Sequence, residues 1–211
     1  MRRGIVALIS VVMIGVVLAG SPVSPVEAQS RSLVWERWDV VIDNVDTKNN
    51  RFDVSEIYEI AFDGTFRFGS AVIPDDNLEA ISDVSVSQDG QVMTASCSGQ
   101  AGTYCVEQVV EGTSITYHFF APITDDSTNF TINYTVEGAL RVYEGGDQLW
   151  WIAIPEEHFG FPILSSTITV EMPQGYGPRE GIDPVATWGA PSEVRVNGQI
   201  VRATATRTIG G

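Results

Sequence analysis

The sequence predicts an all-β domain, an antiparallel β-sandwich of the immunoglobulin-like kind, preceded by an N-terminal signal segment. Three observations predict this fold. Apolar and polar residues alternate over short segments, which is typical of strands with one buried face. Turn-forming residues separate these segments at a spacing of roughly ten residues, as in a sandwich of many short strands. The first residues have the composition of an export signal.

The export signal has three parts. Arg2 and Arg3 form a positive start, an uncharged apolar run extends from Gly4 to Gly20, and Val26-Glu27-Ala28 fits a signal-peptidase site. We therefore expect residues 1–28 to be a cleaved signal peptide. At about 17 residues the apolar run is at the lower limit for spanning a bilayer, so a retained signal anchor is the alternative.

The charge of the chain is strongly negative, at −15. Cleavage after Ala28 would remove Arg2, Arg3 and Glu27, leaving 10 basic and 26 acidic residues and a charge of −16. Such a charge disfavours nucleic acid and anionic lipid as partners. We expect residues 29–211 to form a single domain, cut short at its C-terminal end because the sequence stops directly after the last predicted hairpin.

The predicted strands follow in order. In the first, Val34, Trp38, Val40 and Ile42 share one face and Glu36 interrupts the pattern. Alternation of the same kind occurs at 52–62, 115–119, 130–136 and 168–172. Asp-Gly and Asn-Gly dipeptides at 63–64, 89–90 and 197–198 predict tight turns. A loop rich in Gly and Pro at 174–191 leads into a last hairpin, 193–197 and 199–204.

The cysteines are Cys97 and Cys105, which bracket a glycine-containing turn. In an exported protein, two cysteines are most simply explained by one disulfide. They lack the Cys-x-x-Cys spacing that lowers a thiol pKa, so we expect a structural bond and no redox site.

Glu56 and a pair of tryptophans are the candidate interaction residues. Glu56 has the parity of Val54 and Tyr58, so a regular strand turns it inward, where a carboxylate needs a partner or a proton. Arg67 and Arg141 are candidate partners; an edge-strand position or a structural hydrogen-bonding role is the simpler interpretation. Trp150 and Trp151 are expected on opposite faces of one strand, one in the core and the other exposed to a sugar, a partner protein or a neighbouring loop.

Acidic loops are the remaining candidates for a site. They lie at 43–46, 75–77 and 125–129. Calcium needs six or more oxygens from such loops, but none has the spacing of a dedicated calcium loop, so solvated turn residues are the favoured interpretation. His118 and His158 are the only histidines. We expect no metal, no cofactor and no catalytic residues.

The order of several segments resembles a known family. These segments are Phe52 to Phe62, Val72-Ile73-Pro74, Ile81 to Val86, Phe130 to Ala139, Gln148 to Trp151, Phe161-Pro162-Ile163 and Thr169 to Pro173. Together they resemble the N-terminal domain of the bacterial predicted membrane proteins called the domain of unknown function 2207 family (YciQ-like). The resemblance covers roughly Trp35 to Ile209 and implies transmembrane helices after the domain. The family often has Arg where Ala71 stands here.

These observations predict a non-catalytic extracytoplasmic module that binds, senses or interacts with an unknown protein or cell-envelope ligand. The resemblance implies a tether at the outer face of the cell membrane, with free secretion as the alternative. A glycan-acting enzyme of the cell surface and a structural spacer domain are the alternative functions.

Overall fold

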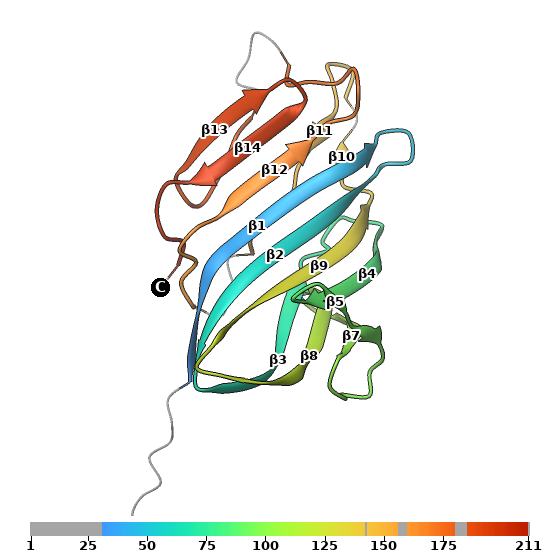
Figure 1. Ribbon diagram of the computed structural model, residues 1–211. Helices are drawn as coiled ribbons and strands as arrows, with labels where there is room; N and C mark the ends of the chain where they lie inside the picture. Colours follow the sequence, from blue (N-terminus) through green and yellow to red (C-terminus); the bar gives the residue numbers. More distant parts are fainter. Residues whose placement is uncertain (1–30, 142, 156–159, 180–184, 211) are drawn as a thin grey trace, which may run out of the picture.

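The computed structural model describes residues 31–141, 143–155, 160–179 and 185–210. The predicted signal segment, 1–28, and His158 lie outside these residues. The described part contains strands and turns and no helix, and its two main sheets pack face to face (Figure 1). The prediction of an all-β sandwich is confirmed. None of the described residues forms a helix long and apolar enough to cross a membrane.

The larger sheet has eight strands in the order β13-β14-β12-β1-β2-β9-β4-β5. Its strands are β1 (Ser32–Asp46), β2 (Arg51–Asp63), β4 (Ala80–Gln88), β5 (Gln91–Val92), β9 (Ser127–Glu137), β12 (Thr167–Glu171), β13 (Ser192–Asn197) and β14 (Ile200–Ala205). All neighbours are antiparallel except β1 and β12, which run parallel.

The smaller sheet has four strands in the order β3-β8-β7-β6. They are β3 (Thr65–Ile73), β6 (Thr94–Ala95), β7 (Thr103–Val109) and β8 (Gly112–Thr124), and a separate short ribbon joins β10 (Leu140–Arg141) to β11 (Gln148–Leu149). In Figure 1 the small sheet lies behind β2, β9 and β4, so the β13, β14 and β12 side of the large sheet extends beyond it.

The first strand departs from the simple alternation at a bulge. The register of β1 with β2 shifts between Trp35 and Arg37, so that the side chains of Trp35 and Trp38 are both buried. A bulge adds one residue to one strand. Residues with the same parity before and after the bulge therefore point to opposite faces of the sheet. Glu36, which interrupts the alternation, lies at this bulge. The expectation that Val34 shares the inner face of Trp38 was therefore wrong, because the bulge puts Trp35 there in its place.

Aromatic side chains fill the space between the sheets. Phe130 of β9 is fully buried against Tyr117 and Phe119 of β8, with ring centroids 5.0 and 4.9 Å apart. Offset and tilted ring pairs at such distances add to the free energy gained by burial. The alternation in 115–119 and 130–136 thus identifies the two strands that face each other across the core.

The outer face of the large sheet is polar. Hydroxyl and amide side chains stand opposite one another across neighbouring strands, because Ser55 pairs with Asn133 and Asn133 pairs with Ser85. Ser55 donates a hydrogen bond to Asn133 at 2.7 Å, and Asn133 donates to Ser85 at 3.2 Å. These bonds form a ladder of side chains across the surface of the sheet.

Candidate functional site

Glu56 lies in the core, as its parity predicts. It is 4% exposed, on β2 between β1 and β9. The Tyr58 hydroxyl donates a hydrogen bond to Oε2 at 2.5 Å, and the Tyr134 hydroxyl donates to Oε1 at 2.7 Å. The carboxyl group is therefore held by two tyrosines from adjacent strands of one sheet.

The arginine partners proposed for Glu56 were wrong. Arg141 donates to the carbonyl oxygens of Gly138 and Asn77, and Arg67 is exposed on β3. The edge-strand interpretation was wrong too, since β2 has a neighbour on each side. Tyr134 was missed as a partner because the sequence gives no sign that β9 pairs with β2, whereas Tyr58 lies only two residues away on the same strand.

Burial dominates the electrostatics of this cluster. Desolvation raises the pKa of Glu56, while hydrogen bonds from Tyr58 and Tyr134 oppose the increase. The indole nitrogen of Trp38 lies outside hydrogen-bond geometry, yet it is close enough to lower the same pKa slightly. Burial also raises the pKa of both tyrosines, with the Glu56 charge adding to the effect. The Glu56 carboxyl group is thus enclosed in the core, with both oxygens bonded to tyrosines.

The two tryptophans separate as predicted. Trp151 packs edge-on against Phe52 with centroids 5.6 Å apart, whereas Trp150 is 51% exposed. They follow β11 in an irregular segment, so they do not share the regular strand that we expected. Trp150 is the residue of the pair that a partner can contact.

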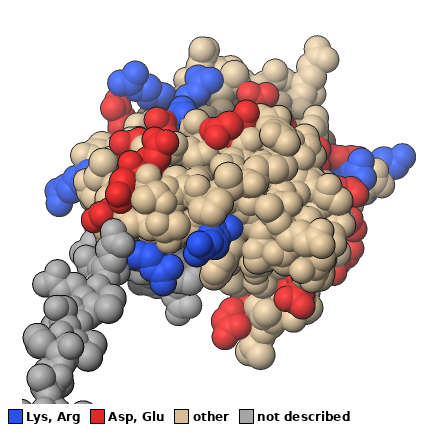
Figure 2. Space-filling view, turned by 60° about the horizontal axis from the view of Figure 1, so that its bottom comes forward, with Lys and Arg blue, Asp and Glu red and all other residues tan. Residues whose placement is uncertain are grey.

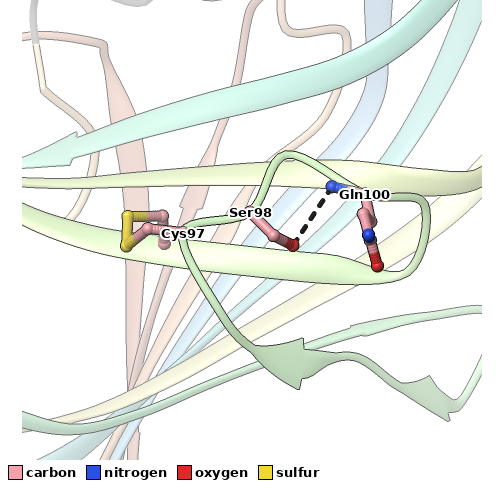
Figure 3. The surroundings of a disulfide bond; sticks show 4 residues. Cys97, Ser98 and Gln100 are labelled. Atoms are coloured by element: carbon pink, nitrogen blue, oxygen red, sulfur yellow. Dashed lines mark hydrogen bonds between the residues drawn. A yellow bond between two sulfur atoms is a disulfide. The ribbon is translucent and has the colours of Figure 1, made fainter.

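The disulfide between Cys97 and Cys105 is present (Figure 3). It closes a turn in which Ser98 accepts a hydrogen bond from the Gln100 amide at 3.4 Å, and Cys105 lies on β7 next to β8. The bond ties the irregular segment after β6 to the small sheet. This is the structural role that the spacing indicates.

The carboxylates of the acidic loops accept hydrogen bonds, Asp46 within its own turn and Asp75 and Asp125 from other segments. Asp46 accepts from the backbone amides of Lys48 and Asn49, at 3.0 and 3.1 Å, and Asp125 accepts from the amide of Gly64 at 2.6 Å. Asp75 accepts from the Thr113 hydroxyl at 3.0 Å. Carboxylates placed in this way stabilise turns.

A row of carboxylates on the outer face was not predicted from the sequence. Asp43 on β1 stands opposite Asp53 on β2, and the parallel register places Glu171 of β12 on its other side. Asp43 and Glu171 line a shallow hollow of about 280 Å³ with Asn44 and Pro173. Partial burial raises the pKa of Asp43, and the charges of Asp53 and Glu171 raise it further. The parallel pairing of β1 with β12 creates this row, and alternation within single segments does not reveal it.

On the face shown in Figure 2, charge is dispersed. In the view of Figure 2, acidic and basic side chains stand in small groups around a broad uncharged area. Among the described residues, no group of three or more His, Cys, Asp and Glu side chains has the arrangement of a metal site. The row at Asp43 is thus a local concentration of negative charge.

Comparison with known proteins gives one family and a general fold. Residues 35–209 match the family described as predicted membrane protein (DUF2207) N-terminal domain. No functionally curated protein matches the sequence.

Solved structures of a hydrolase and of a metallopeptidase are similar to this chain. Yeast LTA4 hydrolase in complex with bestatin is similar with a TM-score of 0.51 and 14% identity, over 84% of this chain and 27% of that one. An M1 zinc metallopeptidase from Deinococcus radiodurans has a TM-score of 0.47 and 10% identity, over 85% of this chain and 40% of that one. The chain thus spans less than half the length of these enzymes, and at this identity the likeness concerns the fold alone.

Proposed function

The chain belongs to the family of predicted membrane proteins with the DUF2207 N-terminal domain, and from that premise we propose that it is a non-catalytic extracytoplasmic module that binds or senses a partner. The membrane association comes from the family. The extracytoplasmic position is supported by the predicted signal at 1–28, and the binding role by the surface described above.

One observation carries the proposal: the first and last described segments meet at one place. Trp35 and Ile209 both form backbone bridges to Ile163, one on each side. Neighbouring strands lie about 4.8 Å apart, so the two segments are roughly 10 Å from each other. A tether before or after the domain therefore attaches at the same region, and the polar outer face and the far end of the sandwich remain free for a partner.

The free surface has a consistent chemistry. It offers the hydroxyl and amide ladder of Ser55, Asn133 and Ser85, and next to it the carboxylate row at Asp43. Such a surface suits a neutral polar or cationic partner and repels polyanions. Glu56 takes no part in binding, because it lies inside the core.

The extracytoplasmic position is tested by a reporter fusion. We expect residues 1–211 fused to alkaline phosphatase, which is active only outside the cytoplasm, to give high activity in bacterial cells. The matched control lacks residues 1–28 and should give none. Equal activity from both fusions would refute export. The intact mass of the exported chain distinguishes cleavage after Ala28 from a retained anchor.

The exposed Trp150 favours one alternative, a glycan-acting enzyme. Such an enzyme uses two carboxyl groups separated by about 5–10 Å on either side of the scissile bond. We expect purified protein incubated with cell-envelope polysaccharide to release no reducing ends. Release that disappears in Trp150→Ala would replace our proposal with the enzymatic one.

A further inference from the structure

The end strand of the large sheet, β13, has an open side. Among the described strands it pairs only with β14. The hairpin between them has Asn197 opposite Ile200, with a two-residue turn between. In Figure 1, β13 forms the outer border of the sheet.

The register defines which backbone groups point outward. Because Asn197 and Ile200 flank the turn, the odd-numbered residues of β13 form the hydrogen-bonded pairs with β14. The bond from Thr206 N–H to the Pro191 carbonyl continues the same pattern. The N–H and C=O groups of Ser192, Val194 and Val196 therefore point away from the sheet.

This edge lacks several of the features that usually prevent strand addition, although Glu193 and Arg195 place charged side chains on it. Natural edges are protected by bulges, prolines, inward charges or very short strands. The edge strand β3 has a bulge between Phe66 and Phe68, and β5 and β6 have two residues each. β13 pairs with β14 without a register shift over its six residues. Its inner face carries Val194 and Val196, which are 36% and 50% exposed.

The outer face of β13 is self-complementary. Glu193 and Arg195 are two residues apart, so they point to the same face. An antiparallel copy centred on Val194 places each Glu193 opposite Arg195 of the second copy. A shift by two residues in either direction places Arg195 opposite Arg195, or Glu193 opposite Glu193, which is destabilising.

The neighbouring strand, β14, strengthens the preference for the register centred on Val194. Arg195 stands directly opposite Arg202 of β14. Two like charges, Arg195 and Arg202, favour a carboxylate on the open side of β13. Within one chain, Arg195 forms an exposed ion pair with Glu193 at 2.9 Å.

We propose that β13 is a homodimerisation edge, which pairs antiparallel with β13 of a second copy around a two-fold axis at Val194. The two large sheets then form one continuous sheet, with Val194 against Val194 and Ser192 against Val196 on the inner face. The contact is small, so the dimer is weak in dilute solution, and a tether to one membrane increases the effective concentration of the two copies. This inference goes beyond the proposed function and does not depend on it.

The test measures association of the exported, purified chain by sedimentation from about 10 μM to about 1 mM. We expect a monomer–dimer equilibrium that Glu193→Arg and Arg195→Glu each weaken by about tenfold or more, because the two-fold axis doubles each change. The double variant with both substitutions restores the charge pattern and should restore dimerisation. Glu144→Arg, at an exposed position in the turn between β10 and β11, controls for the change in net charge.

Crosslinking tests the register directly. Opposed residues of a hydrogen-bonded antiparallel pair have Cα atoms about 5.5 Å apart, within the range of a disulfide. Val194→Cys should therefore form a covalent dimer under mild oxidation, and Val110→Cys, at a 99% exposed position of a hairpin tip, should not. A chain that stays monomeric at about 1 mM, a dimer that Glu193→Arg leaves intact, or a double variant without restored dimerisation would each overturn the proposal. A Val194→Cys chain that couples only to another polypeptide would overturn it as well.

Discussion

Replacing Glu56 by Gln removes a buried ionisable group while preserving its size. The wild-type carboxyl has its pKa raised above the usual 4.5 by burial. A raised folded-state pKa means that the folded protein holds the proton more tightly than the unfolded chain does. The contribution of Glu56 to stability is therefore fully present below pH 4.5 and is lost as the pH rises through the folded-state pKa.

The size of the stability change follows from the difference in proton binding between the folded and unfolded chains. Between the unfolded and folded pKa values, the free energy of unfolding of the wild type should fall by about 1.4 kcal/mol per pH unit relative to Glu56→Gln, and then become constant. Hydrogen bonds from Tyr58 and Tyr134 limit the pH range of this decrease, because they favour the charged form. The pH at which the difference levels off gives the folded pKa.

The measurement is urea unfolding, followed by tryptophan fluorescence, from pH 4 to about pH 9, below the usual range of tyrosine. Glu144→Gln controls for the loss of one carboxyl at an exposed position. Glu56→Ala should be less stable than Glu56→Gln by about 2–6 kcal/mol at every pH, because both tyrosine hydroxyls lose their acceptor. A difference between wild type and Glu56→Gln that stays flat, or that changes in favour of the wild type as pH rises, would refute the reasoning.

Three further changes test the packing by the same unfolding assay. Converting Cys97 and Cys105 to Ser together should lower stability by about 2–3 kcal/mol, since the loop is short; no change would mean that the turn holds without the bond. Trp151→Ala should cost about 3–5 kcal/mol, whereas Trp150→Ala should stay within about 0.5 kcal/mol; equal losses would contradict their different burial. Gly112→Ala should cost about 1–3 kcal/mol, because its φ is 137° and a Cβ would lie 2.2 Å from a carbonyl oxygen of β3.

Sequence periodicity predicted which way side chains face. The inward turn of Glu56 and the last hairpin follow from the alternation of apolar and polar residues. This succeeds because the period of a strand is two, so neighbours within one segment determine the faces. The disulfide was predictable for a similar local reason, the short spacing between Cys97 and Cys105.

Periodicity did not predict which strands are neighbours. The parallel pairing of β1 with β12 joins segments that are more than 100 residues apart, and it creates the row of Asp43, Asp53 and Glu171. One tyrosine partner of Glu56 has the same origin, since Tyr134 becomes close only when β9 pairs with β2. Alternation within a segment contains no information about its partner strand.

The burial of Glu56 changes where the function of this chain should be sought. A carboxyl group on an inward-facing position suggested an interaction site, but its two oxygens are occupied by tyrosines within the core. A ligand would have to separate the two sheets to reach it, with loss of aromatic contacts such as that of Tyr117 with Phe130. Our proposal therefore places recognition on groups that are already at the surface: the polar outer face, the carboxylate row and the open edge of β13.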